Sequence, residues 1–122
     1  MIDAIEAAKG KRITGLRLDP DMNCLLFWFE DGTRLRIFDD GQSCCENRYM
    51  RTDDKLDDYV GAIFEGIELR DAPPIAADGY RGEHEVQFLA IRTSSGQFVM
   101  SNHNEHNGYY GGFSLVADSG QQ

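Results

Sequence analysis

The sequence predicts an α+β domain that is mostly antiparallel β, with about seven strands in a curved sheet or small sandwich and one or two short helices. The apolar run over residues 24–30 is typical of a buried strand, and the Asp31-Gly32 pair behind it is typical of a tight hairpin turn. Elsewhere, short segments alternate apolar with polar residues. With 122 residues, the chain is long enough for one core, so residues 1–122 are expected to form a single domain.

The first third of the chain predicts a short helix and a three-strand meander. Acidic residues near the start and Gly10 at the end favour a helix over residues 2–9. Strands are expected over 13–18, 24–30 and 33–38, the last because leucine and isoleucine alternate there with arginine. The meander is therefore the framework of the predicted sheet.

The middle of the chain predicts a loop, a helix and a further strand. Residues 39–43 read as a loop, and Thr52 is expected to cap a short helix that ends before Gly61. A strand over 63–70 follows, with Gly66 as the site of a β-bulge. The proline- and glycine-containing segment that comes next, residues 71–82, is expected to be a surface loop.

The last third predicts a hairpin and a final strand. Strands over 84–93 and 97–102 are joined by a Ser-Ser-Gly turn, and a last strand covers 113–116. Residues 118–122 are expected to fray.

Composition narrows the class of partner. Twelve basic and 21 acidic residues give a net charge of −9, and no basic stripe is visible, so direct nucleic-acid binding is not expected. No membrane-spanning run and no signal peptide are visible, so a cytoplasmic location is expected. The odd cysteine count fits a reducing compartment, with Cys24 and the lone Trp28 buried in the apolar run. The sequence leaves the oligomeric state open.

Residues 101–112 are the first candidate site, because they combine amides, imidazoles and tyrosines with three glycines. A stretch this polar is not expected inside a helix or a central strand. It is therefore predicted to be a loop at the rim of a sheet. Asparagine amides can read polar groups and the tyrosines can stack on a ligand. The candidate ligand-binding residues here are Asn102, His103, Asn104, Glu105, His106, Asn107, Tyr109 and Tyr110.

A second candidate segment surrounds an adjacent cysteine pair. In extended backbone Cys44 and Cys45 face opposite sides, so one is expected to be buried while the other lines a cavity. A nucleophilic thiol would need a basic neighbour such as Arg48 or a histidine. The residues assigned to the ligand-binding site from this segment, with one histidine from elsewhere, are Cys44, Cys45, Glu46, Arg48, Tyr49 and His84.

A metal site is not predicted. His103 and His106 are three residues apart, a spacing that lets two imidazoles meet on a helical turn but not in an extended strand. Glu105 or His84 would have to supply a third ligand. Because the glycines nearby disfavour a helical turn, no metal and no cofactor are expected.

Four segments together resemble one family of small bacterial and bacteriophage proteins, catalogued as a domain of unknown function. They are Gly-Gln-Ser-Cys-Cys-Glu-x-Arg-Tyr (41–49), Glu-Leu-Arg-Asp-Ala-Pro (68–73), His-Glu-Val-Gln-Phe-Leu (84–89) and Asn-His-Asn-Glu-His-Asn-Gly-Tyr-Tyr-Gly-Gly-Phe (102–113). The resemblance covers residues 13–116 and implies a phage or mobile-element origin. It implies no catalytic residues.

The leading hypothesis is a non-enzymatic module that binds a protein or a small polar ligand through residues 102–110 and 44–49. This requires the two segments to meet in space. One alternative is a small enzyme with a Cys-His pair or a metal site. The other is an acidic inhibitor or immunity-type protein that mimics nucleic acid, with carboxylates grouped around Asp53, Asp54, Asp57 and Asp58.

Overall fold

The computed structural model describes residues 2–19, 24–39, 47–71, 75–76, 83–106 and 115–121. In chain order the elements are α1 (Ile2–Ala8), β1 (Ile13–Asp19), β2 (Cys24–Phe29), β3 (Thr33–Asp39), β4 (Asn47–Arg51), the 3-10 turn η1 (Leu56–Tyr59), β5 (Phe64–Asp71), β6 (Ile75–Ala76), β7 (Glu83–Thr93), β8 (Gly96–His106) and β9 (Leu115–Gln121). Every named strand pair is antiparallel. The predicted fold class is confirmed, although more than the expected seven strands are present.

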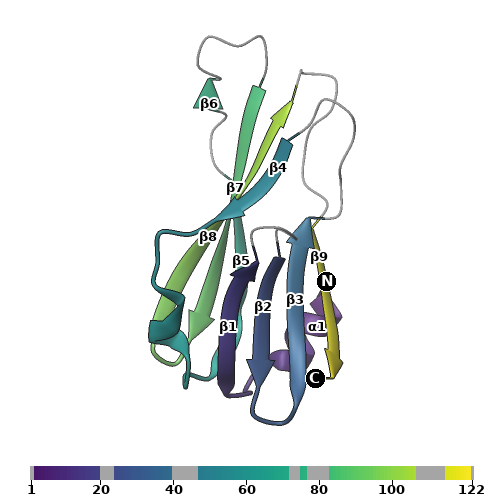
Figure 1. Cartoon of the computed structure of the whole chain (residues 1–122), viewed down its shortest axis with the longest axis vertical. Coiled ribbons are helices and arrows are strands. Elements are labelled where there is room, and N and C mark those ends of the chain that lie inside the picture. The colour runs from purple at the N-terminus through teal and green to yellow at the C-terminus, as the bar shows by residue number, and fades with distance from the viewer. Residues whose placement is uncertain are drawn as a thin grey trace.

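The strands form two sheets (Figure 1). The first sheet has the order β1-β2-β3-β9, and the second has the order β4-β8-β7-β5 with the short β6 added to β7. The helix α1 contacts β9 and β3 of the first sheet and β5 of the second. The prediction left a curved sheet and a sandwich open, and the structure has the two layers of a sandwich.

The core lies between the sheets and is built from both. Phe27 and Phe29 of β2 meet Phe64 of β5 edge to face, with ring centroids 5.3 and 6.0 Å apart. Leu35 and Ile37 of β3 are fully buried beside them. The predicted meander is therefore confirmed, and its inward-facing residues supply the first sheet's share of the core. Trp28 was expected in the core, but it is on the opposite face of β2 and half-buried.

The helix predicted to follow Thr52 is wrong. The Thr52 hydroxyl donates to the carbonyl of Val99, and the Asp54 carboxylate accepts a hydrogen bond from the Val99 N–H. Both contacts hold this segment against β8. Only a 3-10 turn then fits before Gly61, whose φ of 95° suits glycine. The bulge expected at Gly66 is confirmed by a register shift between β5 and β7.

The prediction that residues 118–122 fray is wrong for Asp118 to Gln121. These residues belong to β9, which pairs with β3 along its whole length. Arg36 of β3 donates to both carboxylate oxygens of Asp118 across this pair. The same guanidinium lowers the pKa of Asp118. The strand is thus held by a contact to a residue 82 positions away, which local sequence does not reveal.

Cys24 is expected to resist alkylation in the folded protein. Its side chain is 1% exposed, which confirms the expected burial, and desolvation raises the pKa of its thiol. Thiolate formation and reagent access are both suppressed. Iodoacetamide labelling followed by peptide mass spectrometry should modify Cys24 in denaturant and spare it in native buffer. Equal labelling in both conditions would contradict this burial.

Asp31 is expected to make stability depend on pH below about 4. Hydrogen bonds from the Thr33 hydroxyl and N–H, and then from Lys11, lower the pKa of Asp31 to about 2. The stabilisation is complete above the ordinary carboxyl pKa and disappears as pH falls through the folded-state value. Asp31→Asn should therefore melt at a lower temperature than wild type near pH 6. The two melting temperatures should converge only as the pH falls below about 2, where Asp31 becomes protonated in the folded protein, and a gap that stays constant with pH would refute the assignment.

Candidate functional site

Strand pairing brings the described parts of the two candidate segments together. β4 pairs with β8, with Tyr49 opposite His103 and Arg48 opposite Asn104. On the other side of β8, β7 places residue 84 opposite Glu105. The three segments that the sequence singled out thus contribute neighbouring strands in the order β4-β8-β7 (Figure 1).

The expectation that residues 101–112 avoid a central strand is wrong for residues 101–106. They form the end of β8, which has β4 on one side and β7 on the other. Two partner strands satisfy the backbone and outweigh weak local propensity. Because side chains alternate across a sheet, the candidate residues are divided between its two faces.

One face carries a ring stack, and we call it the Tyr49–His103 face. The two rings are parallel to within 6°, with centroids 4.6 Å apart. The Arg51 guanidinium lies 5.1 Å from the centroid of the Tyr49 ring. Burial, and then the negative charge of Glu105, raise the pKa of Tyr49, so its phenol stays protonated. The residues of this face are Tyr49, Arg51, Ser101, His103 and Glu105.

Ser101 and His103 form a hydrogen bond on this face. His103 Nε2 lies 3.0 Å from the Ser101 hydroxyl oxygen. The same hydroxyl donates to the carbonyl of Arg51 at 3.2 Å. With the hydroxyl proton directed at the Arg51 carbonyl, the imidazole N–H is the donor to Ser101. In this arrangement the hydrogen bond orients the His103 ring.

The opposite face is buried and polar. Arg48 donates from one nitrogen to both carboxylate oxygens of Asp39, at 2.9 and 2.8 Å. Their side chains are 9% and 5% exposed. This ion pair ties β4 to the end of β3 in the other sheet. Asp39 was placed in a loop by the sequence prediction, and nothing in its local sequence indicates the contact.

Two asparagines of β8 share this buried face and differ in their contacts. Asn102 is 1% exposed, and neither its side-chain oxygen nor its nitrogen has a hydrogen-bond partner among the described residues. Asn104 is fully buried and its side-chain oxygen also lacks a hydrogen-bond partner there, but the residue does have an interaction partner. Asn102 is flanked by Met50 on β4 and Gln87 on β7. An unpaired buried amide is costly, so this position is energetically unfavourable to the fold.

Several candidate residues lie outside the described residues: Cys44, Cys45, Glu46, Asn107, Tyr109 and Tyr110. His84 and His106 are described by their strand positions alone. The chain from His103 to His106 is strand, and not the helical turn that joint metal ligation would need. Within the described residues, no three histidine, cysteine, aspartate or glutamate side chains are close enough to hold a metal ion.

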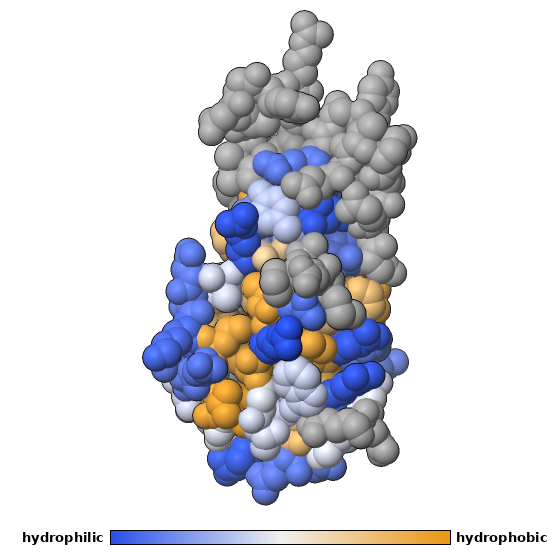
Figure 2. All heavy atoms as spheres, in the orientation of Figure 1, coloured by the Kyte–Doolittle hydropathy of each residue, from blue (hydrophilic) through white to orange (hydrophobic). Residues whose placement is uncertain are grey.

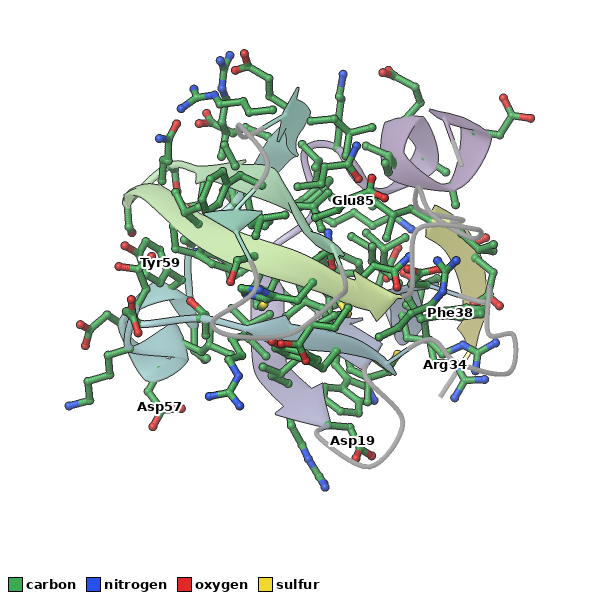
Figure 3. The ribbon with its side chains drawn as sticks, turned by 90° about the horizontal axis from the view of Figure 1, so that it is seen from above. Asp19, Arg34, Phe38, Asp57, Tyr59 and Glu85 are labelled. Carbon is green, nitrogen blue, oxygen red and sulfur yellow. The ribbon has the colours of Figure 1, made fainter. Side chains whose placement is uncertain are left out.

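The acidic group expected around η1 is present but small. Asp53, Asp57 and Asp58 are exposed there, and Asp54 is bound to β8. Figure 3 shows Asp57 near Tyr59, on the far side of the molecule from Arg34. Elsewhere in the described chain, several carboxylates pair with cations, as Glu68 does with Arg92, while Asp3 and Glu65 are exposed.

The protein is a two-sheet antiparallel β domain, and its candidate site lies where polar residues of β4 and β8 pair. The chain belongs to a family described as a domain of unknown function, DUF7448, whose model matches residues 6–116. Comparisons with curated proteins and with solved structures gave no match. No helix in the described parts of the chain has the length and apolar character needed to cross a bilayer.

Proposed function

We propose that this protein is a non-enzymatic binding module whose Tyr49–His103 face recognises a protein or a small polar ligand. The family resemblance and composition support a cytoplasmic protein of phage or mobile-element origin. The observation that carries the proposal is the parallel Tyr49–His103 stack on an accessible part of β4 and β8.

The chemistry of this face suits recognition by stacking and hydrogen bonding. Flat, prealigned rings bind a planar group or a peptide with little loss of conformational entropy. Arg51 adds a cation beside Tyr49, while Glu105 adds an exposed carboxylate next to the stack. Opposite charges on the two sides of the stack favour a partner that is polar and not simply anionic.

Ser101 favours binding over catalysis on this face. Its proton is directed at a backbone carbonyl, so the Ser101–His103 contact lacks the geometry of an activated nucleophile. The alternative of an acidic nucleic-acid mimic is less well supported, because several carboxylates away from η1 are paired with arginine or lysine.

The test compares capture by wild type and by a Tyr49→Ala/His103→Ala variant of the full chain, followed by mass spectrometry of proteins and small molecules. The matched control is Arg92→Ala/Gln97→Ala, an exposed cross-strand pair at the other end of β8. A ligand lost by the first variant and kept by the control would support the proposal. The same catch from all three proteins would overturn it.

Folding of each variant is checked by circular dichroism. If the double alanine variant unfolds, His103→Gln tests the stack alone, because it retains a polar side chain and removes the ring. Binding that survives His103→Gln unchanged would count against this face.

A further inference from the structure

The outward face of the first sheet is a regular array of three rows, each crossing β1, β2, β3 and β9. Cross-strand register defines the rows. Four side chains in these rows are half-buried and apolar, namely Leu26, Trp28, Phe38 and Val116. In order, the rows are Gly15, Trp28, Arg34 and Gly120; then Arg17, Leu26, Arg36 and Asp118; then Asp19, Cys24, Phe38 and Val116.

This face is more apolar than an exposed sheet surface usually is. A strand that is apolar on both faces, as β2 is, is typical of a strand covered on both sides. No described element packs over it. Figure 2 shows hydrophobic side chains interspersed with hydrophilic ones over β1, β2 and β3. In the view from above, Arg34 and Asp19 lie on this side of the molecule (Figure 3).

Two glycines let the larger side chains of the first row lie close to the sheet surface. A Cβ at Gly15 would lie 3.0 Å from the Trp28 ring, and a Cβ at Gly120 would lie 3.1 Å from Arg34 Nε. The indole and the guanidinium therefore lie down over the neighbouring strands. A face of such low relief suits packing against another sheet.

The charges on this face are incompletely paired. Arg17 lies 3.9 Å from Asp19, and Arg36 is bound to Asp118. Arg34 forms no ion pair with any described carboxylate, although the chain has a net charge of −9. Its Nε is buried and makes no hydrogen bond. Among the described residues its charge acts on Asp118, which is already bound to Arg36.

We propose that a second copy of this chain covers the outward face of the first sheet in a two-fold symmetric dimer. A two-fold axis between the faces and parallel to the strands keeps each row at its own level. It places β1 over β9 and β2 over β3 of the second copy. Trp28 then faces Arg34, and Arg17 faces Asp118, so the face is complementary to itself.

The positions of the arginines favour this axis over the alternative two-fold axis, which runs perpendicular to the strands. An axis perpendicular to the strands would set Arg17 against Arg17 and Arg36 against Arg36, which is repulsive. Four strands and three rows give a footprint of about 400 Å² per copy from standard strand spacings. That is about half of the roughly 800 Å² per partner of a standard interface, so a weak, transient dimer with a dissociation constant on the order of 10–100 µM is expected.

The experiment uses Trp28, the chain's one tryptophan, as its reporter. Sedimentation velocity and Trp28 emission are recorded on the full chain from about 1 to 500 µM, which spans the expected constant. We expect a monomer–dimer transition with a blue shift of emission at the same concentration. Leu26→Glu should weaken dimerisation at least about tenfold by burying a carboxylate. Leu69→Glu, an exposed leucine on β5 in the other sheet, is the matched control and should not.

Arg34→Ala provides a milder variant and should also weaken the dimer if Leu26→Glu impairs folding. A monomer at every concentration would overturn the proposal. A dimer that forms with unchanged Trp28 emission, or that Leu69→Glu disrupts and Leu26→Glu does not, would place the interface elsewhere and also overturn it. A monomer whose emission shifts on adding poly-L-glutamate or a single-stranded oligonucleotide would assign the face to a polyanion instead.

Discussion

Asp39→Asn is expected to lower the free energy of unfolding by about 3–5 kcal/mol, because it removes a carboxylate that is ion-paired with a buried arginine. Arg48 and Asp39 are 9% and 5% exposed, so solvent cannot replace the lost carboxylate. Arg48 cannot avoid the cost of a buried charge by losing its proton, because the guanidinium of arginine stays charged at ordinary pH. The guanidinium must therefore stay charged in a buried environment or force the structure open.

Urea denaturation followed by circular dichroism measures this loss. Glu68→Gln is the matched control, because it makes the same carboxylate-to-amide change in an ion pair whose side chain is 44% exposed. It should cost much less, because solvent screens an exposed ion pair. The double variant Asp39→Leu/Arg48→Met should recover most of the lost stability, since it removes both charges. If Asp39→Asn costs no more than Glu68→Gln, the pair is not buried in solution.

The same variant has consequences for the candidate site. The Arg48–Asp39 pair joins β4 to the first sheet, and β4 supplies Tyr49 to the ring stack. Hydrogen exchange should therefore accelerate in β4 more than in the core strands β2 and β3. The ion pair thus positions the binding face by fixing the strand that carries half of it.

The meander was predictable because its signals are local. An apolar run, a turn signal and an alternating strand lie within one segment, and each agrees with burial between the sheets. The strands β4 and the end of β8 lacked such signals. Asn102 and Asn104 replace apolar residues on the inward face of β8, so its alternation of apolar and polar residues disappears there.

Composition therefore indicated the candidate segments, but the loop conformation predicted for residues 101–106 was wrong. Amides and imidazoles indicated contact chemistry, but the strand that holds them is stabilised by pairing with Tyr49 and Arg48, some 50 residues away. Sequence reasoning named neither Arg51 nor Ser101 as a ligand-binding residue, although Ser101 begins the candidate segment. Residues 48–51 read Arg-Tyr-Met-Arg, which does not alternate apolar with polar residues and so gave no clear strand signal.

The two buried asparagines of β8 predict opposite responses to leucine. Asn102→Leu is expected to raise the free energy of unfolding by about 1–3 kcal/mol, because it removes a buried amide that has no partner. Asn104→Leu is the matched control and should lower stability, since Asn104 has an interaction partner that the change would lose. Leucine keeps the branching of asparagine, so the two variants differ mainly in what the amide contacts.

Thermal and urea denaturation of both variants decide the matter, with a shift of several degrees in melting temperature expected for each. A fall in stability for Asn102→Leu would show that its amide is satisfied, for example by an ordered water molecule. If Asn102→Leu is more stable than wild type, the capture experiment is repeated with this variant. A residue that costs the fold stability and is still present points to a role outside folding. If the stabilised Asn102→Leu protein also loses its ligand, the buried amide supports binding indirectly, through the strand that carries His103; if it keeps its ligand, Asn102 has no role in binding by the Tyr49–His103 face.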